Sequence, residues 1–542
     1  MSDLGAMQDW PLLVSRLIDH AGLNHGDREI VSLAVEGGTH RTNWREVRLR
    51  ALKVAQSLKR LGIEPGDRVA TLAWNTWRHV ESWYGISGLG AVAHTINPRL
   101  FSEQIVYIAN HAEDRVLFFD LSFMALVEQI APQLKTIEHF VVLTDAAHLP
   151  DSTLKLIAYE DLIATANGDF VWTLLDENAP AGLCYTSGTT GNPKGVLYSH
   201  RSNVLHAMAA SMTDTYGMSQ RTAVLPIAPM FHANAWGIPY TAALTGAKLV
   251  LNGANFDAPT LSNLIRDESV TFSLAVPTVW LTVLQHLERT GEGLGNLERV
   301  AIGGSAVPRS MIEAFRDRHN VTVGHLWGMT EMSPLGTLGV LCSNVLALSP
   351  EAQVDMQCKQ GRASFGVEMK IVGDDGAELP RDGRSFGSLL VRGPWVVGRY
   401  FKNEGGEALD DGGWFDTGDV ATIDPLGYMQ IVDRSKDVIK SGGEWISSID
   451  LENAAVGAPG VAEAAVIGIH HPKWDERPLL LVRAREGETV TKQGVLDYLA
   501  PRIAKWWTPD EVLVVDDLPH TATGKLLKTE LRARYKDYVL PT

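Results

Sequence analysis

Residues 185–195 have the composition in this chain that is best suited to binding phosphate. They read YTSGTTGNPKG, with three glycines, three threonines, one serine and a single lysine, Lys194. Glycines let the backbone approach a ligand closely, and successive N–H groups, hydroxyls and a lysine form a donor surface suited to phosphate. The helix-opening phosphate loop is excluded, because Lys194 precedes its glycine and no Ser or Thr follows it. The flanking apolar runs predict a loop between two strands, with a plain surface turn as the alternative.

Two carboxylates lie in positions where they could bind a metal ion or a sugar. Glu331 is the only acid in residues 325–334, and a carboxylate in such surroundings is costly unless it is paired or binds a metal. Mg²⁺ prefers one or two protein oxygens beside phosphates and water, so Glu331 and the hydroxyl of Thr186 would suit it. Asp419 follows Gly418 after a predicted strand, where its carboxylate could accept hydrogen bonds from ribose hydroxyls. A simple turn is the alternative there.

Two further residues are candidates for a functional role only because of the motifs in which they lie. His232 lies in PMFHANAWG, and Lys525 lies in LPHTATGKL. A lone histidine between prolines and aromatic residues is more often structural than functional, and most surface lysines have no specific role.

These segments resemble, in order and over almost the whole chain, the motifs of the adenylate-forming superfamily. That superfamily includes acyl-CoA synthetases, peptide-synthetase adenylation domains and luciferases. The most specific matches are YTSGTTGNPKG, the run GYMQIVDRSKDVIKSGGEWIS and the final LPHTATGKL. Because no carrier-protein segment is fused, the resemblance favours an acyl-CoA synthetase, and PMFHANAWG with SGGEWISSIDLEN is similar to the medium-chain fatty acyl-CoA ligase branch.

The resemblance implies a role for each matching residue. The catalytic residues are expected to be Lys525, His232 and Glu331, and the metal ligands Thr186 and Glu331. Contacts to ATP or AMP are expected from Thr186, Ser187, Gly188, Thr189, Thr190, Lys194, Gly304, Ser305, His325, Trp327, Gly328, Met329, Thr330, Asp419, Arg434 and Lys440. The acyl pocket is expected to contain His232, Trp236, Gly303, Gly304 and Pro334. The CoA-binding residues are expected to be Lys436, Ser441, Gly442, Gly443, Glu444, Trp445 and Glu476. For Trp236 the alternative is core packing, and for Glu476 it is a surface salt bridge.

The resemblance also implies a two-step reaction with ATP, Mg²⁺ and coenzyme A. A carboxylic acid would attack ATP to form an acyl-adenylate and pyrophosphate, and the thiol of CoA would then take the acyl group. The resemblance implies 3-(methylthio)propionate (methylmercaptopropionate) and short- and medium-chain fatty acids as the substrates. The sequence does not rank methylmercaptopropionate, butyrate and hexanoate securely, since one methylene changes binding by only ~1–3 kcal/mol. The competing interpretations are a medium-chain fatty acid–CoA ligase without thioether preference, a luciferase-like monooxygenase and a non-enzymatic adenylate sensor.

The elements that must position these residues follow a βα pattern. Helical periodicity is expected at 9–24, 42–61, 77–89 and 102–111, and strands at 69–73, 91–96 and 116–119. Alternation of this kind predicts an α/β fold with a mostly parallel sheet. Short strands from residue 365 onward predict a small β-barrel. We expect an adenylation domain at 1–432 and a mobile α+β lid at 433–542, with a hinge near Asp433. Within the lid, helices are expected at 448–454 and 495–503.

The bulk composition narrows the possible partners. The chain has 542 residues, 45% of them hydrophobic, and a formal net charge of −16, which argues against a general nucleic-acid binder. Three cysteines without ligand-like spacing predict neither a disulfide framework nor a metal cluster. No signal peptide and no bilayer-length apolar run are evident, so we expect a cytoplasmic protein without a membrane span. Related synthetases suggest a homodimer by analogy alone.

Overall fold

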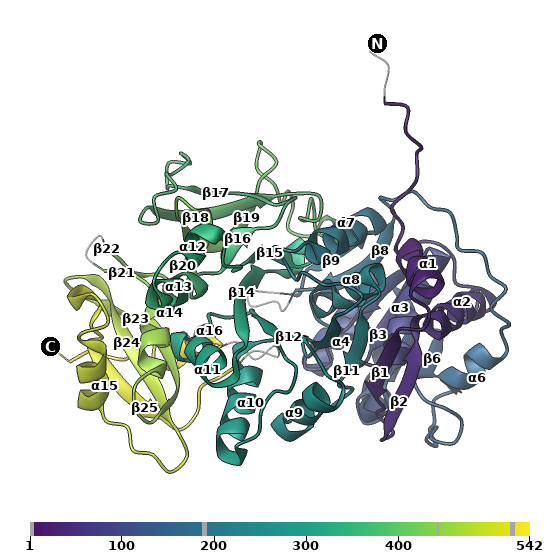
Figure 1. Ribbon diagram of the computed structural model, residues 1–542, viewed down its shortest axis with the longest axis horizontal. Coiled ribbons are helices and arrows are strands. Elements are labelled where there is room, and N and C mark those ends of the chain that lie inside the picture. The colour runs from purple at the N-terminus through teal and green to yellow at the C-terminus, as the bar shows by residue number, and fades with distance from the viewer. Residues whose placement is uncertain (1–4, 187–191, 442–443, 521–525, 542) are drawn as a thin grey trace.

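Three sheets organise the chain. The computed structural model describes residues 5–186, 192–441, 444–520 and 526–541, with the backbone alone at 444–445. Within these residues the strands form sheets of seven, thirteen and five members (Figure 1). The predicted α/β class, with a large N-terminal part and a small C-terminal part, is confirmed. No helix in the described ranges has both the length and the apolar character needed to cross a bilayer.

The seven-stranded sheet has the order β7-β6-β5-β3-β4-β8-β9 and is parallel except for its last pair. Its strands are β3 Arg68–Leu72, β4 Val92–Thr95, β5 Asp114–Phe119, β6 His139–Val142, β7 Leu156–Ala158, β8 Pro180–Tyr185 and β9 Gly195–Ser199. The connecting helices are α2 Trp44–Arg60, α3 Trp77–Leu89, α4 Ser102–Ala112, α5 Met124–Ile130 and α6 Tyr159–Ala164. The predicted βα alternation is therefore confirmed, as are the two strands predicted to flank residues 185–195.

The thirteen-stranded sheet joins a parallel half to an antiparallel half. The parallel half comprises β1 Glu29–Leu33, β10 Ala223–Pro226, β11 Lys248–Leu251, β12 Phe272–Ala275, β13 Arg299–Ile302 and β14 Thr322–Gly328, with β2 Thr39–Asn43 antiparallel at its edge. The antiparallel half comprises β15 Leu335–Leu338, β16 Gly361–Ala363, β17 Glu368–Val372, β18 Phe386–Arg392, β19 Phe415–Ile423 and β20 Tyr428–Arg434. The β-rich part thus begins before residue 365 and continues directly from β14, because β14 and β15 pair.

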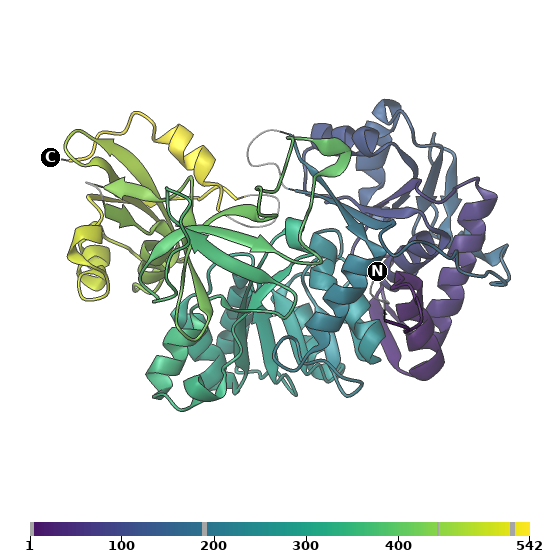
Figure 2. The ribbon, with the colours of Figure 1, turned by 90° about the horizontal axis from the view of Figure 1, so that it is seen from above.

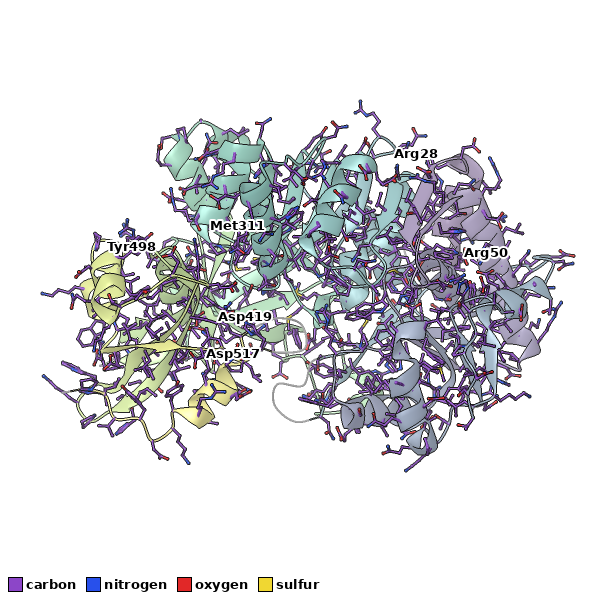
Figure 3. All side chains as sticks on the ribbon, turned by 90° about the horizontal axis from the view of Figure 1, so that it is seen from below. Arg28, Arg50, Met311, Asp419, Tyr498 and Asp517 are labelled. Carbon is purple, nitrogen blue, oxygen red and sulfur yellow. The ribbon has the colours of Figure 1, made fainter. Side chains whose placement is uncertain are left out.

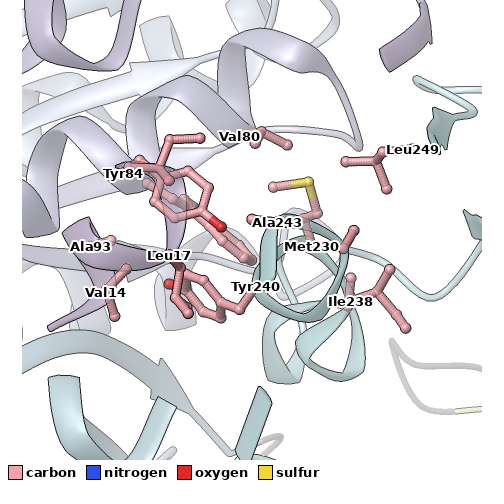
Figure 4. Packing of buried hydrophobic residues seen from close by; sticks show 14 of the residues in the cluster. Val14, Leu17, Val80, Tyr84, Ala93, Met230, Ile238, Tyr240, Ala243 and Leu249 are labelled. Atoms are coloured by element: carbon pink, nitrogen blue, oxygen red, sulfur yellow. The ribbon is translucent and has the colours of Figure 1, made fainter. Parts of the chain in front are cut away.

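Helices cover this sheet and connect it to the first one. They are α1 Val14–Asn24, α7 His200–Ser211, α8 Ile238–Thr245, α9 Ala258–Asp267, α10 Pro277–Thr290, α11 Arg309–His319, α12 Ser343–Leu346 and α13 Pro350–Gln357. In Figure 4, Tyr240 of α8 lies beside Tyr84 of α3, and the Tyr84 hydroxyl donates to the carbonyl oxygen of Pro239 at 3.0 Å. This buried contact fixes the two sheets relative to each other around one core.

The first helix begins later than predicted. We expected it to include residue 9, but α1 begins at Val14, and Trp10 lies outside it with 53% of its surface exposed. Pro11 explains the difference, since a proline disfavours helical dihedrals in the residue before it. Trp10 instead packs against the guanidinium of Arg16, with the ring centroid 4.0 Å from Cζ.

The five-stranded sheet lies at one end of the elongated molecule (Figure 2). It contains β21 Ile439–Ser441, β22 Glu444–Ile446, β23 Val461–His471, β24 Asp475–Ala484 and β25 Glu511–Val515, with helices α14 Ser448–Val456, α15 Lys492–Leu499 and α16 Lys528–Arg534. Helix α15 lies earlier than the predicted 495–503, because Pro501 cannot continue a helix past Leu499. All strands of this sheet follow residue 434.

Candidate active site

A cavity of about 630 Å³ lies between the large part of the molecule and the C-terminal segment that carries α16. Of the predicted site residues, those that line it are Thr186, Lys194, His232, Trp236, Gly304, Gly328, Met329, Thr330, Glu331, Pro334, Arg434 and Lys436. Those that are described but do not line it are Gly303, Ser305, His325, Trp327, Asp419, Asp433, Lys440, Ser441 and Glu476. The predicted Ser187, Gly188, Thr189, Thr190, Gly442, Gly443 and Lys525 lie outside the described residues, as do the side chains of Glu444 and Trp445.

The two ends of the phosphate-type loop are held together by backbone pairing. Tyr185 pairs with Gly195 across β8 and β9. The N–H of Thr186 donates to the carbonyl oxygen of Lys194 at 2.9 Å, and the N–H of Lys194 donates back to Oγ1 of Thr186 at 3.2 Å. The ammonium of Lys194 lies 4.8 Å from the centroid of the Tyr400 ring. Thr186 and Lys194 are thereby both positioned on the cavity wall.

Glu331 is the buried carboxylate of the cavity. It lies in the short turn Thr330–Met332 with 8% of its surface exposed. The Tyr400 hydroxyl donates to its Oε1 at 2.9 Å, and burial, with the Glu331 charge, raises the pKa of Tyr400 well above its usual value. The described residues contain no group of three or more His, Cys, Asp and Glu side chains able to hold a metal. Glu331 and Thr186 both line the cavity, and a carboxylate with a hydroxyl is a donor set that suits a Mg²⁺ ion whose other ligands are phosphates and water.

Asp419 of β19 contacts side chains of the next strand, β20, and of the distant strand β14. Its Oδ2 accepts the indole N–H of Trp327 at 2.8 Å, and its Oδ1 lies 2.8 Å from Nε of Arg434. Figure 3 shows Asp419 near the centre of the molecule, beside the C-terminal part. Only 2% of its surface is exposed, while its neighbours Gly418 and Arg434 line the cavity. Each oxygen of the carboxylate thus has a side-chain partner that fixes its orientation.

His325 is a buried core histidine. Its Nδ1 lies 2.9 Å from the carbonyl oxygen of Cys358, and 1% of its surface is exposed. Burial lowers its pKa to about 4, so the ring is neutral at physiological pH.

The wall that carries His232 and Trp236 has an unusual backbone. Asn234, Ala235 and Trp236 have φ values of 54°, 48° and 56°, so the chain forms a left-handed turn within Ala233–Gly237. Such a conformation costs about 1–2 kcal/mol for each residue other than glycine. No sequence signal could have indicated it, because alanine and tryptophan do not favour positive φ. The turn places both His232 and Trp236 on the cavity wall.

His206 supports this turn and was missed by sequence reasoning. Its Nε2 accepts the backbone N–H of Leu335 at 3.1 Å, directly after the predicted pocket residue Pro334. Gly237 lies so close that a Cβ there would be 2.5 Å from Cε1 of His206. Burial lowers the pKa of His206 to about 3, so its ring is an acceptor rather than a cation. Its position within α7 offered no pattern that distinguishes it from other helical histidines.

We expect His206 to make stability depend on pH. An unfolded histidine titrates near 6.5, so the stabilisation is complete above that value and is lost as the pH falls toward 3. At pH 5 the loss is about 2 kcal/mol. Denaturant unfolding should show that the difference in unfolding free energy between wild type and His206→Gln shrinks by about this amount from pH 7.5 to pH 5. The exposed His470→Gln is the control. An unchanged difference for His206→Gln would contradict the prediction.

The predicted hinge residue, Asp433, is held by two hydrogen bonds where the large part of the molecule meets the C-terminal part. Both oxygens of Asp433 accept backbone N–H groups, Oδ1 from Arg434 at 2.8 Å and Oδ2 from Ser448 at 2.7 Å. Asp433 is fully buried, and this burial raises the pKa of its carboxyl. The junction ties the end of β20 to the start of α14.

Among the predicted CoA-binding residues with described side chains, Ser441 and Glu476 lie on the paired strands β21 and β24 of the five-stranded sheet. The N–H of Lys440 donates to Oε2 of Glu476 at 3.0 Å, and Oγ of Ser441 accepts from Arg477 at 3.2 Å. Glu476 thus contacts the backbone of β21; a contact to CoA stays a prediction for this residue, with a surface salt bridge as the alternative.

Comparison with known proteins identifies matching families and relatives. Residues 18–401 match the model of the AMP-binding enzyme family, and residues 450–525 match that of the AMP-binding enzyme C-terminal domain. The 3-methylmercaptopropionyl-CoA ligase of Ruegeria lacuscaerulensis is 52% identical over 538 residues, covering 98% of this chain and 99% of the relative. The medium-chain-fatty-acid–CoA ligase of Ectopseudomonas oleovorans is 49% identical over 542 residues, covering 99% and 98%. The crystal structure of an anthranilate CoA ligase with anthranoyl-AMP superimposes with a TM-score of 0.86 at 26% identity, covering 98% and 99%.

Proposed function

The chain belongs to the AMP-binding enzyme family, and we propose that it joins short- and medium-chain carboxylic acids, among them 3-(methylthio)propionate, to coenzyme A. It is an AMP-forming acid–thiol ligase that uses ATP. The relatives named for methylmercaptopropionate and for medium-chain fatty acids both align over nearly their full lengths.

One observation carries the proposal: a single cavity combines a phosphate-type end with an apolar end. The polar residues Thr186, Lys194 and Glu331 line the same cavity as the apolar residues Trp236 and Val276. A cavity with both properties suits a reaction that joins an apolar acid to a nucleotide phosphate. The apolar residues would bind the acyl chain and the polar residues the phosphates, so the reacting atoms would be held close together between them.

In the first step, a carboxylate oxygen attacks the α-phosphorus of ATP, and the bond to the bridging oxygen breaks. The products are an acyl-adenylate and pyrophosphate. Thr186 and Lys194 would hold the leaving phosphates, and Asp419 and Arg434 the ribose. Bound Mg²⁺, held by Glu331 and Thr186, would offset phosphate charge. Lys525 would neutralise the charge that develops between the carboxylate and the α-phosphate.

In the second step, the thiol sulfur of CoA attacks the acyl carbonyl carbon, and AMP leaves with the electrons of the broken C–O bond. We propose that the part after Asp433 rotates between the two steps, so that Lys525 withdraws and residues 441–445 approach. The bonds that Asp433 makes to Arg434 and Ser448 support a pivot at this position. A few dihedral changes at such a residue suffice for a hinge. By analogy with related synthetases we also propose a homodimer, which sedimentation analysis would test.

The test of the function is a substrate panel. Purified protein with ATP, Mg²⁺ and CoA should convert methylmercaptopropionate, butyrate and hexanoate to their CoA thioesters and release one pyrophosphate for each. The thioesters should be absent when CoA is omitted. Pyrophosphate release at a rate independent of the acid supplied would contradict an acyl ligase.

A further inference from the structure

Arg99 is a cation of the cavity that the reaction described above does not use. It lies between β4 and α4, lines the cavity and remains accessible to solvent. Its Cζ is 5.3 Å from the ring centroid of Phe256 and 5.8 Å from that of Phe231. A guanidinium within about 6 Å of aromatic faces is held in place by their negative electrostatic potential.

The electrostatic surroundings of Arg99 differ from those of other cavity cations. Four of these have partners within the described part of the chain: Arg434 with Asp419, Lys528 with Glu452, Arg532 with Asp437, and Lys194 with the ring of Tyr400. Among the same residues Arg99 forms no ion pair, and only its backbone N–H donates, to Oδ1 of Asn97 at 2.9 Å. Partial burial lowers the pKa of Arg99, and no carboxylate opposes that shift. Within the part of the chain that the structure describes, its five side-chain N–H donors therefore have no protein acceptor.

The cavity residues near Arg99 are mostly apolar. Phe231 directly precedes the predicted acyl-pocket residue His232, and Phe256, Val276 and Val279 line the same cavity. Phe231 and Phe256 also contact Trp74, with both ring centroids 5.7 Å away. A fixed cation beside an apolar wall suits a ligand whose chain is apolar and whose far end is anionic, because a guanidinium binds a carboxylate or phosphate through two parallel hydrogen bonds.

We propose that Arg99 binds an oxyanion that a substrate carries into the apolar end of the cavity, and that the distal carboxylate of a medium-chain dicarboxylic acid is the preferred source. This inference rests on the proposed ligase function, in which the other carboxylate reacts with ATP. A phosphate group of CoA is the second source with the same chemistry.

The test compares adipate with hexanoate, which have the same chain length and differ in the distal group. We expect Arg99→Leu to lower kcat/KM for adipate by about 10- to 100-fold, as loss of a hydrogen bond to a charged group predicts. The value for hexanoate should change less than about threefold. Arg99→Lys should restore part of the adipate activity. Arg221→Leu, an exposed arginine outside the cavity, is the matched control.

The same variants distinguish the two sources. A rise in the KM for CoA that is equal for both acids, and that disappears with 3′-dephospho-CoA, would assign the oxyanion to a CoA phosphate. Kinetics of Arg99→Leu that match those of Arg221→Leu with all substrates would overturn the inference. If wild type converts no acid, the proposed function fails. In that case, calorimetric titration with adipate still tests the role of Arg99, since the affinity for adipate must fall at least about tenfold in Arg99→Leu.

Discussion

Replacing Lys525 with alanine is expected to lower acyl-adenylate formation by at least about 10³-fold, while thioester formation from preformed acyl-AMP changes less than about tenfold. A positioned cation that stabilises the negative charge developing in the transition state typically raises the rate by about this factor. Lys525 itself lies outside the described residues, but Leu526 and Leu527, which follow it directly, line the cavity. Pyrophosphate release measures the first half-reaction, and transfer from synthetic acyl-AMP to CoA measures the second.

The control for this prediction is Lys505→Ala, which removes an exposed lysine of the same C-terminal part. Both half-reactions should remain within about twofold of wild type in that variant. If Lys525→Ala reduced both half-reactions equally, the role proposed for Lys525 in the first step would be wrong.

A proline at residue 443 should produce the reverse pattern. Gly442 and Gly443 leave space for the narrow pantetheine arm of CoA in the proposed second step, since neither has a Cβ. We expect Gly443→Pro to spare pyrophosphate release and to slow acyl transfer to CoA by about tenfold or more. Equal rates of transfer in the variant and in wild type would show that this backbone does not contribute to the second step.

Replacing Glu331 with glutamine is expected to have the second-largest effect. The variant keeps the size of the side chain but removes the charge that would hold Mg²⁺ against the phosphates. We expect kcat/KM for ATP to fall by about 10²-fold or more and the Mg²⁺ concentration at half-maximal rate to rise about tenfold. Calorimetric titration with ATP in the presence and absence of Mg²⁺ gives a readout that does not depend on turnover.

Tyr400→Phe is the matched variant for Glu331. It removes the hydroxyl that donates to Oε1 of Glu331 at 2.9 Å but keeps the ring beneath the Lys194 ammonium. The same two measurements should shift in the same direction as in Glu331→Gln, by about tenfold at most. A Glu331→Gln enzyme with the Mg²⁺ dependence of wild type would exclude Glu331 as the metal ligand.

Local patterns in the sequence were sufficient to predict α2 to α4, β3 to β5 and the two strands that flank residues 185–195. The glycines and the flanking apolar runs there act within a few residues, as does the alternation that predicts α2 to α4 and β3 to β5. The errors have local causes too: Pro11 delays α1 to Val14, and Pro501 ends α15 at Leu499. The family motifs also led to twelve of the residues that line the cavity, among them Thr186 after β8 and Glu331 after β14.

Only the tertiary structure decided how these residues are paired. The indole of Trp327 and the carboxylate of Asp419 are 92 positions apart, and they meet because the sheet continues from β14 through β15, β16 and β20 to β19. The left-handed turn at Ala233–Gly237, the support from His206 and the acid-free surroundings of Arg99 were likewise invisible in the sequence. Each depends on which strands and helices become neighbours, and that choice is made by packing over the whole core rather than by any single segment.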